Sequence, residues 1–192
     1  MRKLVFATHN KNKMREIQSL MPEDIQLLSL DDINCFEDIE ETESTIEGNA
    51  ILKANYIKKK YGYDVFADDT GLEVKALDDQ PGVYSARYAG SHKSDADNMQ
   101  LLLQNMEEKT NREAQFKTVI ALCLGDDTHI FEGIIKGTIT TAPMGTNGFG
   151  YDPVFQPIGF SQTFAQLPLT TKNEISHRGK AFKKLLSFLR KI

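Results

Sequence analysis

Apolar residues in the N-terminal part of the chain follow two different periodicities. Residues 3–7 predict a short buried strand, in which Leu4 to Ala7 are apolar. Over residues 11–21, apolar side chains recur at helical spacing, which predicts a helix that Pro22 stops. Residues 25–30 are rich in Ile and Leu and predict a second strand. The chain therefore begins as an alternation of strand and helix.

A second helix and a third strand are predicted next. Ser44 followed three residues later by Glu47 predicts a capping box, which opens a helix that ends at Gly62. Residues 64–67 predict another buried strand, which ends at a polar Asp-Asp-Thr-Gly segment at 68–71.

The rest of the chain mixes helices with one long hairpin. Ser94 predicts the N-cap of a helix, and an amphipathic pattern from His177 onward predicts another. Residues 115–124 and 128–140 flank a Gly-Asp-Asp turn, which indicates two long antiparallel strands. We therefore expect an α/β fold with a mixed β-sheet flanked by helices. Residues 1–192 would form a single domain, whose two lobes share that sheet.

Composition narrows the function classes. The 192 residues contain 23 Lys and Arg against 27 Asp and Glu, a net charge of −4, which argues against a nucleic-acid partner. No apolar run approaches the roughly 18–20 residues that span a bilayer, and we identify no signal peptide, so we expect no membrane partner. Two cysteines, Cys35 and Cys123, match neither a disulfide framework nor a zinc site, which favours a cytoplasmic protein.

Residues 8–13 lead from the first strand into a helix N-terminus. Backbone N–H groups there suit an anion, and Lys13 adds a positive charge. The segment matches neither the dinucleotide nor the P-loop pattern. The alternative is that Thr8 or Asn10 caps the helix and that the lysines are solvated.

Carboxylates occur where a metal could be held. Asp68 and Asp69 directly follow a predicted strand end, where open α/β sheets place ligands, and Glu41 lies in an acidic loop. Mg²⁺ typically takes one or two carboxylates plus phosphate oxygens and waters, which Glu41 and Asp69 could supply. Turn chemistry is the alternative, because Asp-Asp also occurs in predicted turns elsewhere in the chain.

A glycine-rich segment over residues 145–153 combines a stacking face, Phe149, with an acceptor carboxylate, Asp152. Those are the groups a nucleobase pocket needs. Gly145 and Gly148 also match the Gly-x-x-Gly of RNA-binding KH loops. The alternative is a turn with Phe149 in the core.

Cations gather near the start of the last helix, where Lys172, His177, Arg178 and Lys180 oppose the helix dipole unless an anion compensates them. This favours a binding role. Lys53, on the helix after the acidic loop, is a lesser phosphate candidate, for which a solvated lysine is the alternative.

Taken together, these segments resemble the Ham1/RdgB-like inosine triphosphatase family of purine nucleoside triphosphate pyrophosphatases. The matching pieces appear in order over nearly the whole chain. They are Phe-Ala-Thr-x-Asn-x-x-Lys at 6–13, Glu-Glu-Thr at 40–42 with Glu-Gly-Asn-Ala at 47–50, Ala-Asp-Asp-Thr-Gly-Leu at 67–72, Pro-Gly-Val-Tyr-Ser-Ala-Arg-Tyr at 81–88, Gly-Phe-Gly-Tyr-Asp-Pro-Val-Phe at 148–155 and Ser-His-Arg-Gly-Lys-Ala at 176–181.

The resemblance implies hydrolysis of ITP, dITP and XTP to the monophosphate and pyrophosphate by a Mg²⁺-dependent homodimer, with two lobes around a central substrate cleft. Glu41 and Asp69 would bind the metal, and Asp69 would also be the general base, although Asp68 stays open for that role. The substrate-binding residues that we expect are Thr8, His9, Asn10, Lys11, Asn12, Lys13, Lys53, Thr70, Phe149, Gly150, Tyr151, Asp152, Lys172, His177 and Arg178.

Donors from His177 or Arg178 aimed at O6 would favour hypoxanthine and xanthine over adenine, by roughly 1–3 kcal/mol for one good pair. His9 and Thr70 depart from the residues common in the family. Two other functions stay open. A Maf-like pyrophosphatase would prefer pyrimidine or modified nucleotides, and a binding protein would hold nucleotide or single-stranded RNA without turnover.

Overall fold

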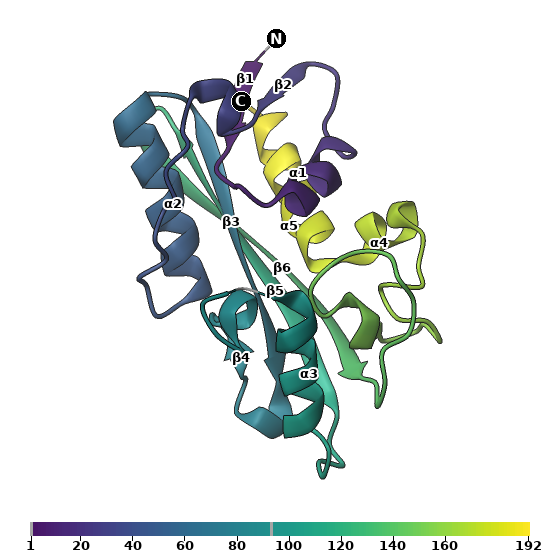
Figure 1. The fold of residues 1–192 in the computed structure, drawn as a ribbon. Coiled ribbons are helices and arrows are strands. Elements are labelled where there is room, and N and C mark those ends of the chain that lie inside the picture. Colours follow the sequence, from purple (N-terminus) through teal and green to yellow (C-terminus); the bar gives the residue numbers. More distant parts are fainter. Residues whose placement is uncertain (1, 93) are drawn as a thin grey trace. The chain divides into compact units, whose positions relative to one another are not determined.

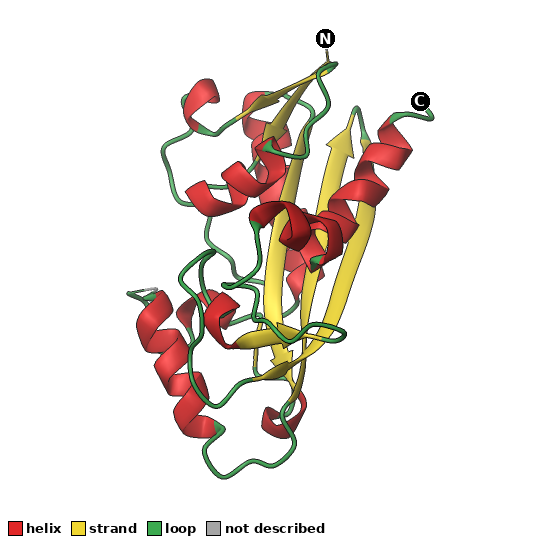
Figure 2. Cartoon of the chain, turned by 90° about the vertical axis from the view of Figure 1, so that its right-hand side faces the viewer, coloured by secondary structure: helices red, strands yellow, loops and turns green. Residues whose placement is uncertain are grey.

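The computed structural model describes residues 2–92 and 94–192, and it contains a mixed sheet with helices on its faces (Figures 1 and 2). The strand order is β2-β1-β3-β5-β6-β7, with β4 paired to β3. Within the sheet, β1 is parallel to β2 and β3, whereas β4 and β7 are antiparallel to their neighbours. The strands are β1 (Arg2–Phe6), β2 (Ile25–Leu28), β3 (Val65–Val74), β4 (Pro81–Gly82), β5 (Glu113–Leu124), β6 (Asp127–Ile139) and β7 (Phe155–Pro157).

The helices begin at side-chain caps that the local sequence provides. Asn10 accepts from the first-turn N–H groups of its helix, and Thr45 and Ser94 each accept one such N–H. Gly62 ends the long second helix in the left-handed conformation (φ 76°). The helices are α1 (Lys11–Gln18), α2 (Ile46–Tyr61), α3 (Asp95–Asn105), α4 (Leu169–Ile175) and α5 (His177–Leu189), with 3₁₀ turns η1 (Asp31–Ile33), η2 (Lys75–Leu77), η3 (Ser85–Arg87) and η4 (Asp152–Val154).

The chain divides into two compact units. Unit 1 consists of Met1–Asp69, Thr118–Gly133 and Arg178–Ile192, and unit 2 of Thr70–Lys117 and Ile134–His177. In unit 1, α2 covers one face of the strands, and α1 and α5 cover the other (Figure 1). Each unit has its own apolar core. That of unit 1 includes Leu4, Phe6, Phe66, Ile120, Leu122, Phe182 and Leu185, and that of unit 2 includes Leu72, Leu102, Met106, Phe116, Phe155 and Phe164.

The mixed sheet, the long hairpin and the helices predicted after Ser94 and from His177 are confirmed. The predicted strand end before Asp68 is wrong, because β3 continues through the Asp-Asp-Thr-Gly segment to Val74. Backbone pairing with β4 at Leu72 extends the strand independently of side-chain polarity. No described helix is long and apolar enough to cross a membrane.

Two helix boundaries also differ from the sequence patterns. The predicted capping box is wrong, since Thr45 rather than Ser44 is the N-cap of α2 and accepts from Gly48 N at 3.0 Å. The sequence pattern did not indicate α4. This helix has only seven residues and starts after Pro168 without a side-chain cap, so neither apolar periodicity nor a capping residue predicts it.

Candidate active site

The loop between β1 and α1 is held by its own side chains. Asn10 Oδ1 accepts from Asn12 N at 2.9 Å and from Lys13 N at 3.1 Å, and Thr8 Oγ1 accepts from Asn10 N at 3.1 Å. The ring of His9 donates from Nε2 to the carbonyl of Glu37 at 3.0 Å. The capping interpretation of Asn10 is therefore confirmed, and phosphate binding by residues 8–13 stays a prediction.

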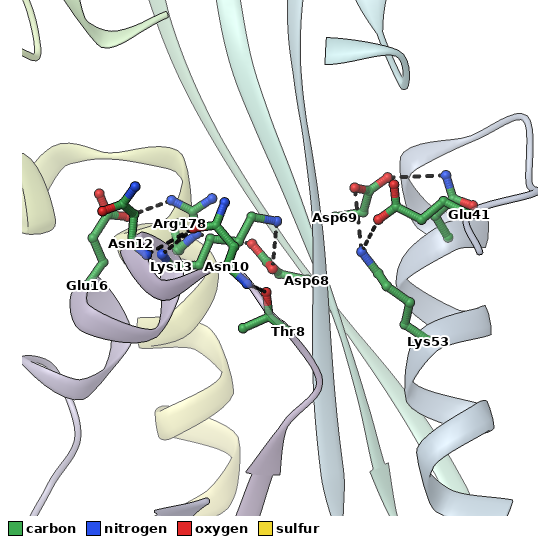
Figure 3. Close-up of polar contacts among 11 residues, drawn as sticks. Thr8, Asn10, Asn12, Lys13, Glu16, Glu41, Lys53, Asp68, Asp69 and Arg178 are labelled. Carbon is green, nitrogen blue, oxygen red and sulfur yellow. Dashed lines mark hydrogen bonds and ion pairs between the residues drawn. The ribbon is translucent and has the colours of Figure 1, made fainter. Parts of the chain in front are cut away.

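Asp68 lies in a buried network of opposite charges on one face of β3 (Figure 3). Its Oδ1 accepts from Lys13 Nζ at 2.9 Å, and its Oδ2 accepts from Arg178 Nε at 3.0 Å. Arg178 Nη1 also donates to Glu16 Oε2 at 2.6 Å. Burial alone would raise the pKa of Asp68, but the charges of Lys13 and Arg178 outweigh burial and hold that pKa well below its ordinary value. The Asp68 side chain is therefore a fixed carboxylate.

Asp69 points the other way, toward α2 (Figure 3). Successive side chains of a strand alternate between its faces, so neighbouring aspartates meet different helices. Asn49 Nδ2 donates to Asp69 Oδ2 at 3.4 Å, and Lys53 Nζ lies 3.7 Å from Asp69 Oδ1. Burial raises the pKa of Asp69 above its ordinary value despite the nearby lysine. The two neighbouring carboxyl groups therefore have pKa values shifted in opposite directions.

Glu41 is brought to Asp69 by a shared cation. Lys53 Nζ lies 2.5 Å from Glu41 Oε1, so its ammonium contacts both carboxylates. The charges of Asp69 and Glu41 outweigh burial and raise the pKa of Lys53. The ammonium is itself a cation, so the structure shows one positive charge shared by the two carboxylates. In the described parts of the chain, no group of three or more His, Cys, Asp or Glu side chains could hold a metal. A pair of carboxylates nevertheless fits Mg²⁺, which completes its shell with phosphate oxygens and waters.

In unit 2, the predicted base-pocket residues form a second polar cluster. Asp152 is 3% exposed, and its Oδ2 accepts from Phe149 N at 2.9 Å and from Lys172 Nζ at 2.6 Å. Lys172 Nζ also lies 5.1 Å from the centroid of the Phe149 ring, which is half-buried. A Cβ at Gly148 (φ +77°) would overlap the Asp152 carboxylate. The glycine therefore makes room for the carboxylate.

His177 is buried against aromatic rings of the same unit. Its ring stacks on Phe116 with centroids 4.6 Å apart and on Phe164 with centroids 6.1 Å apart. Nearby in the sequence motif, Gly150 N donates to Asp95 Oδ2 and the Tyr151 hydroxyl donates to the carbonyl of Ser85, each at 2.8 Å. These two hydrogen bonds hold the segment around Gly150 and Tyr151 in place. Thr70, which is the first residue of unit 2, is half-buried.

The KH-like interpretation of Gly145 and Gly148 gains no support. A Cβ at Gly145 (φ +86°) would lie 2.5 Å from the backbone of Ala165, and Asn147 N donates to the Ala165 carbonyl at 3.0 Å. The glycines are required by packing within the chain itself.

The structure distributes the predicted residues between the two units. Lys13, Glu41, Lys53, Asp68, Asp69 and Arg178 belong to unit 1, and Phe149, Gly150, Tyr151, Asp152, Lys172 and His177 belong to unit 2. Arg178, predicted for the nucleobase, pairs with Asp68 and Glu16, and its role in base recognition stays a prediction. Lys11, the remaining cation of the loop, is exposed.

Sequence reasoning missed Glu16 and Asn49. Glu16 follows Lys13 by three residues and stands beside the buried Ile17, so its helical position indicates the same inward face. Asn49 stands beside Ala50 on the buried stripe of α2, where an amide needs a polar partner.

The fold and the buried acids and cations of unit 1 define an α/β protein with a cluster suited to a polyanion and a cation. The chain belongs to the Ham1 family, whose model matches residues 4–188. It is 64% identical over 187 residues to a dITP/XTP pyrophosphatase of Flavobacterium johnsoniae, covering 97% of each chain. Its identity to the dITP/XTP pyrophosphatase of Porphyromonas gingivalis is 49% over 190 residues, covering 98% of each.

Solved structures agree with this assignment. The Ham1 protein of Staphylococcus aureus superposes with a TM-score of 0.89 at 42% identity, covering 98% of each chain. A HAM1 protein of Coxiella burnetii superposes with a TM-score of 0.92 at 39% identity over the full length of both. The predicted fold class and the family resemblance are confirmed.

Proposed function

We propose that this protein hydrolyses dITP, ITP and XTP to the nucleoside monophosphate and pyrophosphate, which removes them from the nucleotide pool. The proposal is carried by the pair of carboxylates, Glu41 and Asp69, that share one cation, Lys53, in a chain of the Ham1 family. It is supported by the relatives named dITP/XTP pyrophosphatase at up to 64% identity.

Glu41 and Asp69 would hold Mg²⁺ with the triphosphate. When bound, the metal would neutralise part of the negative charge of the phosphates. Asp69, whose pKa burial raises, accepts a proton from the attacking water at a carboxylate oxygen. Lys13, together with the other residues of the 8–13 loop and with Lys53, binds the phosphates. Asp68 keeps Lys13 in place through the 2.9 Å ion pair.

Selection of the base is assigned to unit 2. Phe149 offers a ring for stacking, and this residue is only half-buried. Asp152 and Lys172 supply an acceptor and a donor whose positions are fixed by their 2.6 Å contact. His177 supplies a ring nitrogen toward O6, which hypoxanthine and xanthine present as an acceptor and adenine does not. The remaining predicted contacts, Thr70, Gly150, Tyr151 and Arg178, complete substrate binding.

The test is a specificity profile with product identification. The protein is incubated with Mg²⁺ and each of dITP, ITP, XTP, ATP, GTP, CTP and UTP, and phosphorus NMR identifies the product. We expect pyrophosphate from the first three. Orthophosphate would contradict the assigned bond, a preference for pyrimidines would favour the Maf-like alternative, and binding of RNA without turnover would favour the binding protein.

We also propose that residues 1–192 act as one nucleotide pyrophosphatase domain, in a cytoplasmic homodimer. The single family model over residues 4–188 supports one domain. Cys35 and Cys123 are buried free thiols, which is consistent with a reducing compartment. The homodimer rests on the family resemblance, and light scattering on the purified protein tests it. Thermal unfolding in a single transition is the expected result for one domain.

A further inference from the structure

The ammonium of Lys53 stands where the proposed metal ion would have to bind. Its Nζ lies 2.5 Å from Glu41 Oε1 and 3.7 Å from Asp69 Oδ1, and the lysine is only 8% exposed. No phosphate is needed to hold it there, because the two carboxylates already neutralise its charge. This arrangement is not indicated by the sequence pattern, since a lysine on a helix is usually solvated.

A divalent ion and this ammonium cannot occupy the same space between the carboxylates. An ion coordinated by Glu41 and Asp69 would be forced against a positive charge in a buried, weakly screened environment. Metal binding therefore requires Lys53 Nζ to move away. The lysine has four flexible methylene groups above a backbone that α2 holds in place, so its head can move while the helix stays.

A displaced ammonium needs a new counter-charge, and the triphosphate brings one. Metal binding and nucleotide binding would then strengthen each other, because the phosphates can contact both the metal and the released lysine. A permanently structural lysine would behave differently. Its loss would also relieve charge repulsion, but the nucleotide would then strengthen metal binding equally with and without the lysine.

We propose that Lys53 is a positioning residue that occupies the metal position in the nucleotide-free protein and thereby couples divalent-metal binding to nucleotide binding. The inference rests on the proposed function, because it takes Glu41 and Asp69 as the metal ligands. It goes beyond phosphate binding by Lys53, since it assigns the lysine a second place in the free protein.

The test measures Mn²⁺ binding by calorimetry without nucleotide, in the wild-type protein, Lys53→Met and a matched control, Lys58→Met. Lys58 is on the same helix and pairs with Asp64 at 2.9 Å, away from Glu41 and Asp69. We expect Lys53→Met to bind Mn²⁺ at least about tenfold more tightly than the wild type, because a competing charge is gone. Lys58→Met should match the wild type.

The second measurement repeats the titration with the α,β-methylene analogue of dITP, which cannot be cleaved at that bond. The analogue should tighten Mn²⁺ binding strongly in the wild type and much less in Lys53→Met. Phosphate ligation alone would strengthen metal binding equally in both proteins, so the difference reports the lysine.

If Lys53→Met does not fold, Lys53→Gln takes its place, because glutamine keeps a donor for Glu41 without the charge. Mn²⁺ binding in the variant that equals or falls below wild-type binding overturns the inference, as does the absence of saturable Mn²⁺ binding in all the proteins. These titrations need no turnover. A failed specificity profile with tighter metal binding in the variant would refute the proposed function and leave the coupling supported.

Discussion

Asp68 and Asp69 are consecutive residues of one strand, yet their carboxylates face opposite sides of it and have opposite pKa shifts (Figure 3). Asp68 accepts from Lys13 and Arg178, whereas Asp69 faces Asn49 and Lys53 on α2. Strand alternation places them this way. A dipeptide that looks like one acidic unit thus contains two carboxyl groups in separate environments, with pKa values shifted in opposite directions.

The first prediction concerns Asp69→Asn. The amide keeps the size of the side chain but cannot accept the proton, so kcat should fall by roughly 10²- to 10⁴-fold. Nucleotide binding, measured by calorimetry with the α,β-methylene analogue of dITP, should remain detectable. Turnover near the wild-type rate would remove Asp69 from the mechanism.

The second prediction concerns Asp68→Asn, which should lower stability more than it alters chemistry. Removing this charge breaks the ion pair with Lys13 and leaves the buried Arg178 with Glu16 as its remaining acidic partner, and breaking a buried pair costs on the order of 3–5 kcal/mol. Urea unfolding measures the free energy. The matched control is Asp64→Asn, which breaks the half-exposed pair with Lys58 and should cost about 0–1 kcal/mol. If the two variants lose equal unfolding free energy, burial does not increase the contribution of the Asp68 ion pairs to stability.

The same variant gives a pH dependence with a defined sign. The folded-state pKa of Asp68 lies below its ordinary value of 3.8, so its stabilisation is fully present above that value. It is lost as the pH falls through the folded-state pKa. The difference in unfolding free energy between the wild type and Asp68→Asn should therefore be constant near neutrality and shrink below about pH 3.8.

Features that depend on neighbours in the sequence were predictable, and features that depend on distant partners were not. The Gly62 end of α2 and the β5–β6 hairpin follow from local turn and periodicity signals. Arg178 and Glu16 are 162 residues apart, and the local sequence around either residue does not predict their ion pair. The burial of Lys53 against Glu41 and Asp69 was not predictable for the same reason, since a buried lysine and a solvated one have the same sequence pattern.

The third prediction compares two glycines of the base-pocket loop. Gly148 and Gly150 both have positive φ, so alanine strains either position by roughly 1–2 kcal/mol. Only at Gly148 would the added Cβ also overlap Asp152, whereas nothing lies within 4 Å of a Cβ at Gly150. Gly148→Ala should therefore lower kcat/KM for dITP clearly more than Gly150→Ala does. Indistinguishable kinetics would mean that the position of the Asp152 carboxylate does not matter for turnover.

The fourth prediction concerns base selection by His177. Phenylalanine at this position preserves the stacking on Phe116 and Phe164 but removes both ring nitrogens. If a ring nitrogen recognises O6, His177→Phe should reduce the ratio of kcat/KM for ITP over ATP by about 5- to 150-fold, which is the worth of one good base contact. The unfolding free energy serves as the control, since the aromatic packing is kept and stability should change little. If the variant has normal stability and an unaltered ratio, base recognition lies with other residues. Lys172 and Asp152 are then the next pair to test, because they form a buried ion pair in the same unit.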